Sequence, residues 1–461
     1  MAAALLALAT VCACLVVWPE VTVNSNPSRL ALTPAAPVLS LRRVPDYLAR
    51  LAAEGRLRSD LDMAFAEAGF DAASGRACLV VHDAMGRRLY SRQPELALLP
   101  ASTVKLLTAS TVFERMGPEA RLTTEVRAVR SPLDGVVDGD IWLVGGGDPL
   151  LATADFAVAA GLQGGPRPAS RLEDLADRIV ASGVRQVRGR VLGDESRYDT
   201  VRYVPTWKPE YVDDGESGPL SALTLNSGFA QLRPTPIPAR APATAAAAAL
   251  TELLERRGVQ VGGVGEGASP IDAVVVTKLE SLPVREVVAE MLQQSDNTTA
   301  ELLTKELGFR FGDGGSTEAG LAVIRASAIG AIGAAAGGLT LFDGSGLDRA
   351  NRATCDALAA LLDRGIAERS LRPVLPVAAQ SGTLIRRFVG TTAAGRVAAK
   401  TGSLEGVVAL SGYASDERNE ALVFASLVTD PREDVARALV DRVAVMLVDY
   451  PDGPTADELG P

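Results

Sequence analysis

A serine and a lysine three residues apart stand at the start of a long apolar run. The run from Ser102 to Met116 ends at Gly117-Pro118, which predicts a helix of about four turns. Residues i and i+3 share one face of a helix, so Ser102 and Lys105 are expected to touch. A neutral lysine amine can take the proton of a serine hydroxyl, so the pair predicts a nucleophile and its base. The alternative is a helix cap and a surface charge.

Lysine is rare in this chain, and this favours a chemical role for Lys105. Of the 46 basic residues, 5 are lysine and the rest are arginine. Arginine keeps its proton in proteins, whereas lysine loses it when it is buried or crowded by another cation. A chain that uses arginine for surface charge is therefore not expected to spend Lys105 on that purpose.

A second polar segment, Ser295-Asp296-Asn297, separates two stretches of helical periodicity, 282–294 and 298–307. One interpretation is local: Asn297 caps the second helix, and Thr298 with Glu301 forms a capping box. The other is that the segment faces the cleft beside Ser102. Ser295 would then relay a proton, and the Asn297 amide would hold an amide group of the substrate.

A third segment, Lys400-Thr401-Gly402-Ser403, lies on the first of three strand-like runs. The runs predict one antiparallel sheet with Lys400 on an edge strand, covered by a helix over 435–447. Lys400 would add positive charge to the cleft, Thr401 and Ser403 would hold a substrate carboxylate, and Gly402 would let the substrate backbone approach. The three runs are 396–403, 407–413 and 421–427.

Charge and composition exclude several classes of function. A net charge of -10 and a pI near 5.0 argue against nucleic acid as a partner. His82 is the only histidine, so a metal site built on histidines is not expected. It lies in an apolar run that predicts a strand, and we expect a structural role for it. The turn at Gly145–Asp148 lacks the Gly-Lys-Ser/Thr ending of a phosphate-binding loop.

The sequence also predicts how the chain is divided. The apolar stretch 2–18 predicts export by a signal peptide or a membrane anchor, and both readings stay open. Cys78 and Cys355 in the exported part fit a disulfide or two buried thiols equally well. The predicted parts are 1–23 signal or anchor, 24–45 tether, 46–117 and 280–450 one domain, 118–279 an inserted mostly β domain, and 451–461 a tail.

Taken together, Ser102-x-x-Lys105, Ser295-Asp296-Asn297 and Lys400-Thr401-Gly402 resemble the motif set of penicillin-binding proteins and class A β-lactamases. The chain is most similar to the D-alanyl-D-alanine carboxypeptidase/endopeptidase family, peptidase family S13, which is penicillin-binding protein 4-like. Further segments that carry this resemblance are Pro100–Lys105, Gly145–Pro149, Asp343–Leu347 with Arg349 to Thr354, Leu375–Ala378 and Gly382–Leu384. Asp348 and Gln380-Ser381 depart from the usual pattern.

The resemblance implies an α+β fold: a transpeptidase domain with an antiparallel sheet flanked by helices, a helical subdomain and the mostly β insertion. It implies that Ser102 attacks D-Ala-D-Ala or D-Ala-diaminopimelate bonds of peptidoglycan stem peptides. Lys105 would act as base, neutral because of burial and the charge of Lys400. The N–H groups of Ser102 and Ser403 would form the oxyanion hole, and Ser295 would pass the proton to the leaving amine.

The same resemblance implies β-lactams as covalent inhibitors, no metal or organic cofactor, and a place in the cell envelope outside the plasma membrane. Membrane contact would come through the N-terminal segment. Two alternatives remain: a β-lactamase, although no Glu-x-x-x-Asn lies between Asn297 and Lys400, and a non-catalytic wall-binding module of the same fold. The balance of carboxypeptidase and endopeptidase activity stays open, as does a role for Asp148 in holding a substrate amine.

Overall fold

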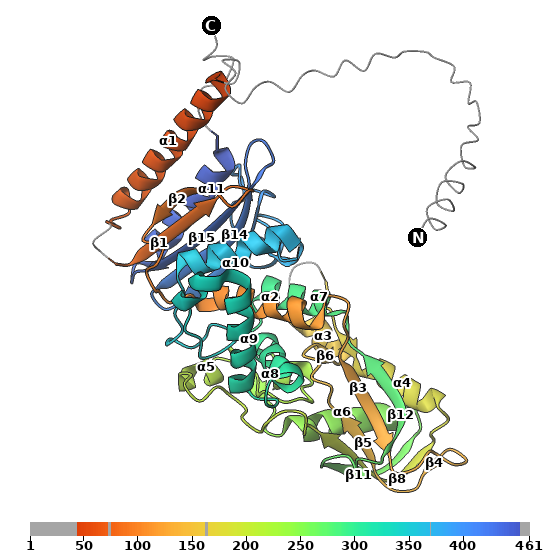
Figure 1. Ribbon diagram of the computed structural model, residues 1–461. Helices are drawn as coiled ribbons and strands as arrows, with labels where there is room; N and C mark the ends of the chain where they lie inside the picture. The colour runs from red at the N-terminus through yellow and green to blue at the C-terminus, as the bar shows by residue number, and fades with distance from the viewer. Residues whose placement is uncertain (1–43, 72–74, 162–164, 369, 452–461) are drawn as a thin grey trace, which may run out of the picture.

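The computed structural model describes residues 44–71, 75–161, 165–368 and 370–451. The predicted signal or anchor, nearly all of the tether, and the tail after residue 451 lie outside these ranges. The described chain forms two larger sheets joined by a set of helices (Figure 1). The predicted α+β class, with an antiparallel sheet flanked by helices, is confirmed.

The first sheet is antiparallel throughout, with the strand order β13-β14-β15-β1-β2. The predicted hairpin of the N-terminal part and the predicted run of three C-terminal strands therefore meet in one sheet. Helices α1 and α11 cover one face, and α10 covers the other (Figure 1). The elements are α1 (Val44–Glu67), β1 (Ala77–His82), β2 (Arg88–Arg92), α10 (Cys355–Glu368), β13 (Val397–Leu404), β14 (Val407–Ser415), β15 (Ala421–Thr429) and α11 (Glu433–Asp449).

The central helices pack around α2, which carries the predicted apolar run. Its Leu106, Leu107 and Val112 are buried in one core with residues of the neighbouring helices, such as Val288 and Leu303. Burial of each such side chain stabilises the folded protein by about 1.5–3 kcal/mol. The helices are η3 (Ala101–Val104), α2 (Lys105–Met116), α7 (Val284–Gln294), α8 (Asn297–Phe311), α9 (Thr317–Ile332) and η5 (Gly333–Gly338), followed by the short turns η6 (Arg372–Val374) and η7 (Gly382–Leu384).

Among the described residues, one helical stretch, Thr317–Gly338, is long and apolar enough to cross a membrane by length and composition. In this structure α9 packs against α8, and its Leu321 and Ile324 belong to the same core as α2. Gly320 lies so close to α8 that a Cβ there would come within 1.9 Å of the Thr304 carbonyl oxygen. We therefore treat this helix as part of the folded body.

The second sheet belongs to the region between α2 and α7, and its order is β11-β8-β5-β3-β12 with β4 beside β8. Strand β8 pairs in parallel with β5 and β11, while β3 pairs antiparallel with β5 and β12. Helices α4 and α6 bury their apolar faces in the core of this region.

The elements of this region are β3 (Thr123–Ala128), β4 (Val136–Val137), β5 (Ile141–Val144), β6 (Leu151–Ala152), α3 (Ala154–Ala160), β7 (Ser170–Arg171), α4 (Leu172–Ala181), β8 (Gln186–Asp194), α5 (Pro209–Asp213), η4 (Asn226–Gly228), β9 (Phe229–Gln231), β10 (Ile237–Pro238), α6 (Pro242–Glu255), β11 (Gln260–Glu266) and β12 (Val274–Glu280).

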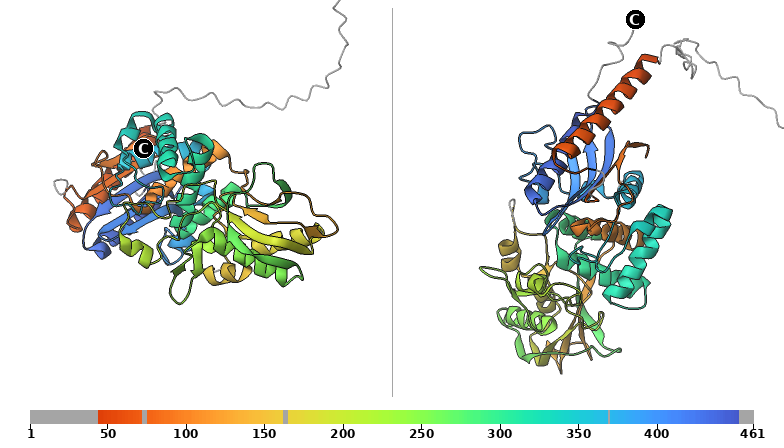
Figure 2. Two further views of the ribbon diagram at one scale, coloured as in Figure 1. Left: turned by 90° about the horizontal axis from the view of Figure 1, so that it is seen from below. Right: turned by 90° about the vertical axis from the view of Figure 1, so that its left-hand side faces the viewer.

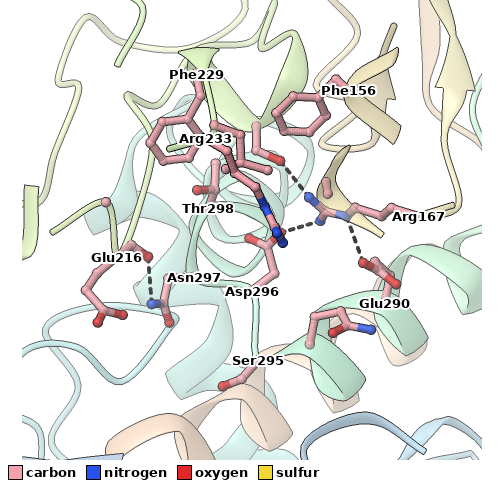
Figure 3. Close-up of a pocket in the computed structure, with 15 residues that line it drawn as sticks. Phe156, Arg167, Glu216, Phe229, Arg233, Glu290, Ser295, Asp296, Asn297 and Thr298 are labelled. Atoms are coloured by element: carbon pink, nitrogen blue, oxygen red, sulfur yellow. Dashed lines mark hydrogen bonds and ion pairs between the residues drawn. The ribbon is translucent and has the colours of Figure 1, made fainter. Parts of the chain in front are cut away.

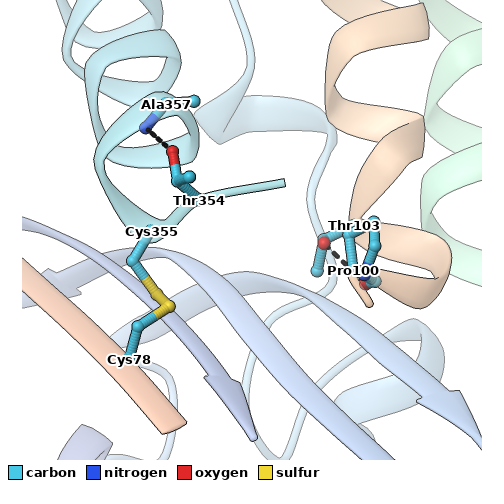
Figure 4. The surroundings of a disulfide bond; sticks show 6 residues. All are labelled: Cys78, Pro100, Thr103, Thr354, Cys355 and Ala357. Atoms are coloured by element: carbon cyan, nitrogen blue, oxygen red, sulfur yellow. Dashed lines mark hydrogen bonds between the residues drawn. A yellow bond between two sulfur atoms is a disulfide. The ribbon is translucent and has the colours of Figure 1, made fainter. Parts of the chain in front are cut away.

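A disulfide links the two halves of the chain that build the first sheet and its helices. Cys78 in β1 is bonded to Cys355 at the start of α10, at a sequence separation of 277 (Figure 4). Both residues are fully buried. Of the two states that the sequence left open, the structure has the bonded one, which holds α10 against the sheet.

The molecule is elongated, with the two sheets at opposite ends and the helices between them (Figure 2). The start of α2 lies where the first sheet meets these helices: η3 contacts β13 and β14, and α2 contacts α7 and α8. This arrangement brings the three predicted motif segments to one place.

Candidate active site

Ser102 lies in a tight turn just before the helix rather than within it. The predicted helix over 102–116 divides into the 3-10 turn η3 (Ala101–Val104) and the α-helix α2 (Lys105–Met116). Ala101 has a φ of 46°, which is uncommon for a residue with a side chain. Gly346 packs against this turn so closely that a Cβ there would lie 2.0 Å from the Ala101 carbonyl oxygen. The packing of Gly346 therefore holds the turn in this conformation. Ser102 itself is half-exposed.

Lys105 is fully buried and its amine touches three oxygens. Its Nζ lies 3.0 Å from Ser102 Oγ, 2.6 Å from Asn297 Oδ1 and 2.7 Å from the Ser345 carbonyl oxygen. The last two atoms can only accept hydrogen bonds, whereas a hydroxyl can also donate one. A neutral amine has two N–H donors and one lone pair, so it matches this set if Ser102 donates its proton to Nζ.

The orientation of the Asn297 side chain is fixed from its other end. Its Nδ2 donates to the Glu216 carbonyl oxygen at 2.8 Å, which leaves Oδ1 facing Lys105. Asn297 is the first residue of α8 and not its cap: Asp296 caps the helix by accepting the Thr299 N–H at 2.8 Å. The local interpretation of Asn297 as N-cap is therefore wrong by one residue.

Ser295 and Lys400 form a second contact between a serine hydroxyl and a buried amine. Lys400 Nζ donates to Ser295 Oγ at 3.0 Å and to the Thr401 carbonyl oxygen at 2.8 Å. Ser295 follows α7 in the left-handed conformation, with a φ of 58°. This conformation is costly for a residue with a Cβ, and such strain is concentrated at functional sites. It turns the chain sharply between α7 and α8.

Both buried lysines have lowered pKa values. Burial lowers the pKa of Lys105 to about 8, although nearby acids, with Asp343 first, oppose this. Burial, and then the charge of Lys105, holds the pKa of Lys400 well below its ordinary value. The charge of one lysine disfavours protonation of the other. The sequence predicted that burial and the charge of Lys400 would keep Lys105 neutral, and burial is the largest cause of the lowered pKa of both lysines.

Strand β13 is the edge of its sheet and presents its backbone to the cleft. The Ala399 N–H donates to the Pro376 carbonyl oxygen, so it points away from β14. Backbone groups alternate with a period of two along a strand. The N–H groups of Thr401 and Ser403 therefore also point away from β14, and both residues line the cleft.

Gly402 has a neighbour that the sequence did not predict. A Cβ at this position would lie 2.8 Å from the Pro100 carbonyl oxygen and 3.2 Å from Ala101 Cβ. The missing side chain therefore makes room for the turn that carries Ser102. Thr401 remains available to the cleft, and its Oγ1 donates to Thr383 Oγ1 at 2.9 Å.

A buried loop, Asp343–Asp348, delivers the third contact of Lys105. Glu301 Oε1 accepts the N–H groups of Gly344 and Ser345 at 2.9 and 2.8 Å, which fixes the peptide whose carbonyl faces Lys105. The expected capping box of Thr298 and Glu301 is thus not formed. Burial, and then the charge of Asp343, raises the pKa of Glu301 to about 8.

Asp343 organises the rest of this loop. Its Oδ1 accepts the Gly346 N–H at 2.7 Å and Asn351 Nδ2 at 2.8 Å, and its Oδ2 accepts Trp207 Nε1 at 2.8 Å. Trp207 comes from the inserted region, so this loop also ties that region to the part of the fold that carries Ser102. The sequence had marked Asp343 only as part of a resembling segment.

Arg167 is a further residue of the site that the sequence analysis missed. Its guanidinium pairs with Asp296, with Glu290 Oε1 at 2.7 Å and with Ser227 Oγ at 2.7 Å (Figure 3). The side chains of Arg167, Glu290 and Asp296 are 12%, 6% and 11% exposed. Burial opposes ionisation of Asp296, but the charge of Arg167 and the Thr299 N–H hold the pKa of Asp296 below its ordinary value. The network fixes the Ser295–Asn297 segment against the inserted region.

We expect Arg167→Met to lower the free energy of unfolding by about 3–5 kcal/mol, because it leaves two buried carboxylates without their cation. Urea denaturation followed by circular dichroism measures this change. The control is Arg256→Met, whose pair with Glu252 on α6 is 66% and 63% exposed and is worth at most about 0.5 kcal/mol. Equal effects of the two substitutions would show that the Arg167 network does not stabilise the fold.

The motif residues border a cleft of about 480 Å³. Ser102, Ser295, Asn297, Thr401 and Ser403 line it, while Lys105 and Lys400 reach these residues from the buried side. A second hollow of about 420 Å³ lies on the other side of the 295–297 segment and holds Arg167 in its wall (Figure 3). The structure thus brings together all the predicted side chains, with Gly402 against the Ser102 turn.

Other residues that the sequence had singled out lie away from this chemistry. His82 Nδ1 lies 2.7 Å from Asp363 Oδ2, in a contact that joins β1 to α10. Asp148 is buried and accepts the Leu150 N–H at 3.0 Å, as a turn residue does. Within the described ranges, no three potential metal ligands of the His, Cys, Asp and Glu types are grouped together.

Comparison with known proteins adds independent evidence. The D-Ala-D-Ala carboxypeptidase 3 (S13) family matches residues 57–240 and 233–449. A D-alanyl-D-alanine carboxypeptidase of an Actinomadura species is 31% identical over 474 residues, which cover 86% of this chain and 85% of the relative. The carboxypeptidase DacB of Mycolicibacterium smegmatis is 31% identical over 78% of each chain.

Among solved structures, penicillin-binding protein 4 of Haemophilus influenzae has the same fold. The TM-score is 0.67 at 18% identity, over 81% of this chain and 98% of the other. The family match spans most of the chain, and the relatives match over most of their own length. The chain therefore belongs to the D-Ala-D-Ala carboxypeptidase 3 (S13) family, and it is a peptidase of that family.

Proposed function

We propose that this protein is a serine D,D-carboxypeptidase/endopeptidase that cleaves D-Ala-D-Ala or D-Ala-diaminopimelate bonds through an acyl-enzyme on Ser102. The observation that carries the proposal is the set of contacts around Lys105. Two of its three partners can only accept hydrogen bonds, so a neutral amine keeps its lone pair for the Ser102 hydroxyl. A serine without such a base is a weak nucleophile.

In the first step Ser102 Oγ attacks the carbonyl carbon of the scissile amide while its proton moves to Lys105 Nζ. The negative charge on the carbonyl oxygen is stabilised by the N–H groups of Ser102 and Ser403. One such donor typically contributes about 3–4 kcal/mol to lowering the barrier. The outward direction of the β13 backbone at Thr401 and Ser403 supports this assignment.

The leaving amine then receives a proton from the Ser295 hydroxyl, which Lys400 contacts at 3.0 Å. The proton that Lys105 took from Ser102 replaces it on Ser295, so that Lys105 is neutral again when the amine leaves. Loss of the amine leaves Ser102 as an ester, and water hydrolyses this ester in the second step. Asn297 Nδ2 is already bonded to Glu216, so we assign Asn297 mainly to holding Lys105 in place. Thr401 and Ser403 bind the carboxylate that follows the scissile bond.

The substrates follow from the relatives, which are D-alanyl-D-alanine carboxypeptidases. We therefore assign peptidoglycan stem peptides as substrates and β-lactams as inhibitors that acylate Ser102. The Haemophilus influenzae protein has been solved in complex with a β-lactam. Peptidoglycan lies outside the plasma membrane, so we place the protein in the cell envelope, with residues 1–23 as its signal or membrane anchor.

The test combines adduct mapping with product analysis. Incubation with benzylpenicillin is expected to add one penicilloyl group to the peptide that contains Ser102, and the adduct should persist for many minutes. Incubation with a muropeptide pentapeptide should release D-alanine, and a cross-linked dimer shows whether endopeptidase activity accompanies it. Rapid turnover of benzylpenicillin without D-alanine release would instead indicate a β-lactamase, and no reaction with either compound a non-catalytic module.

A further inference from the structure

The charges on the wall of the catalytic cleft are unevenly paired. Three cationic side chains line it: Lys208, Arg387 and Arg437. Lys208 lies 3.5 Å from Glu405, and Arg387 forms an ion pair with Asp441. Arg437 makes no hydrogen bond or ion pair with any residue in the described part of the chain. It is therefore the cation in this wall whose charge is not already used.

The acids about one turn from Arg437 on its own helix do not pair with it. Residues four positions apart on a helix share a face, so Glu433, Arg437 and Asp441 form one row on α11. Glu433 accepts the Gly406 N–H at 2.9 Å, and Asp441 pairs with Arg387. Asp434, three positions before Arg437, is exposed and forms no ion pair with it.

These two contacts also fix where the row lies. Gly406 is in the turn that follows β13, and Arg387 follows η7, whose Thr383 bonds to Thr401 of β13. Glu433 thus fixes one end of the row at the turn after β13, and Asp441 fixes the other end near Thr401. Arg437 lies between them. Arg437 accordingly reaches the same cleft as Thr401 and Ser403.

Lys400 of β13 does not supply a free positive charge beside Thr401 and Ser403. Lys400 is fully buried, and its amine is bonded to Ser295 and to the Thr401 carbonyl oxygen. The hydroxyl groups of Thr401 and Ser403 are neutral donors. A carboxylate bound by these two hydroxyls alone would lack a counter-charge, although hydrogen bonds to a charged donor are about twice as strong as neutral ones.

We infer that Arg437 is a specificity residue that binds the free carboxylate of the residue leaving the scissile bond, together with Thr401 and Ser403. This inference rests on the proposed function. It predicts that the enzyme selects substrates in which the leaving D-amino acid ends in a free carboxylate over those in which that group is an amide. The charge of the guanidinium, rather than its bulk, makes the distinction.

The experiment compares two peptides that differ only at that group: a diacetylated L-Lys-D-Ala-D-Ala and its C-terminal carboxamide. Liquid chromatography measures kcat/KM for release of D-alanine and of D-alaninamide. We expect Arg437→Gln to lower kcat/KM for the free acid by roughly 10- to 100-fold, the range for a hydrogen bond to a charged group. Hydrolysis of the carboxamide should change by less than about 3-fold, and Arg437→Lys should lie between wild type and Arg437→Gln.

The matched control is Arg442→Gln on the same helix, because Arg442 pairs with Glu67 and does not line the cleft. It should leave both rates unchanged. Equal loss with both peptides in Arg437→Gln, or no loss with either, would overturn the assignment while leaving the proposed function intact. A wild-type enzyme that hydrolyses neither peptide would refute the proposed function, and the assignment with it.

Discussion

Replacing Ser102 by alanine is expected to abolish labelling by a fluorescent penicillin and to lower D-alanine release by a factor of roughly 10⁴ to 10⁶, the range for loss of a catalytic nucleophile. Ser102 is the hydroxyl that contacts the buried amine of Lys105, whereas Ser295 contacts Lys400 from the turn between α7 and α8. Labelling is read on a gel, and D-alanine release by a coupled assay.

The same substitution should leave the free energy of unfolding within about 1 kcal/mol of wild type. Ser102 is half-exposed, and Lys105 keeps its bonds to Asn297 and the Ser345 carbonyl when the hydroxyl is removed. The control is Ser91→Ala, an exposed serine on β2, which should label like wild type. Labelling that survives Ser102→Ala in a folded protein would remove Ser102 from its proposed role.

Much of the first sheet was predictable because its strands are marked locally. The runs before and after the 416–419 turn alternate or are continuously apolar, and they form β14 and β15 as expected. The three motif segments were also recognisable, since each is a short run of fixed residue types. What joined them was the resemblance to a family, because periodicity alone does not say that residues 102, 295 and 400 meet.

The details of the site were less predictable because they depend on contacts between distant segments. The left-handed conformations of Ala101 and Ser295 have no local signal, since neither residue is glycine or asparagine. The choice of Asp296 as helix cap, in place of Asn297, is made together with the Arg167 ion pair from the inserted region. Arginine is the common basic residue of this chain, so nothing in the sequence distinguishes the buried Arg167 from the exposed arginines.

Glu301 illustrates how a local rule is overridden by tertiary structure. Its spacing from Thr298 fits a capping box, yet its carboxylate binds two N–H groups of the Asp343–Asp348 loop. That loop also needs Gly346 next to Ala101. The parallel pairing of β8 with β5 and β11 was not predicted for the same reason. Parallel strands need a crossover connection, and the packing of its helix on the sheet is a tertiary contact.

Replacing Lys105 by arginine is expected to reduce acylation by benzylpenicillin by roughly 10²- to 10⁴-fold, while keeping the positive charge. General-base catalysis typically contributes about 10²–10⁴-fold, and a guanidinium does not give up its proton at any pH used for such assays. Because the side chain is fully buried, Lys105→Met serves as a second variant of similar length. Both should fail to acylate, which separates loss of the base from loss of the charge.

The pH dependence of the wild-type enzyme provides the decisive readout for this role. Burial lowers the pKa of Lys105 to about 8, and the base is its deprotonated form. The acylation rate should therefore rise about tenfold per pH unit below pH 8 and level off above it. The control Lys278→Arg, an exposed lysine paired with Glu280 on β12, should keep the full profile. A wild-type rate that does not change between pH 6 and 8, or an arginine variant that acylates within tenfold of wild type, would show that Lys105 is not the base. Either result would direct attention to Lys400, the other buried amine of the site.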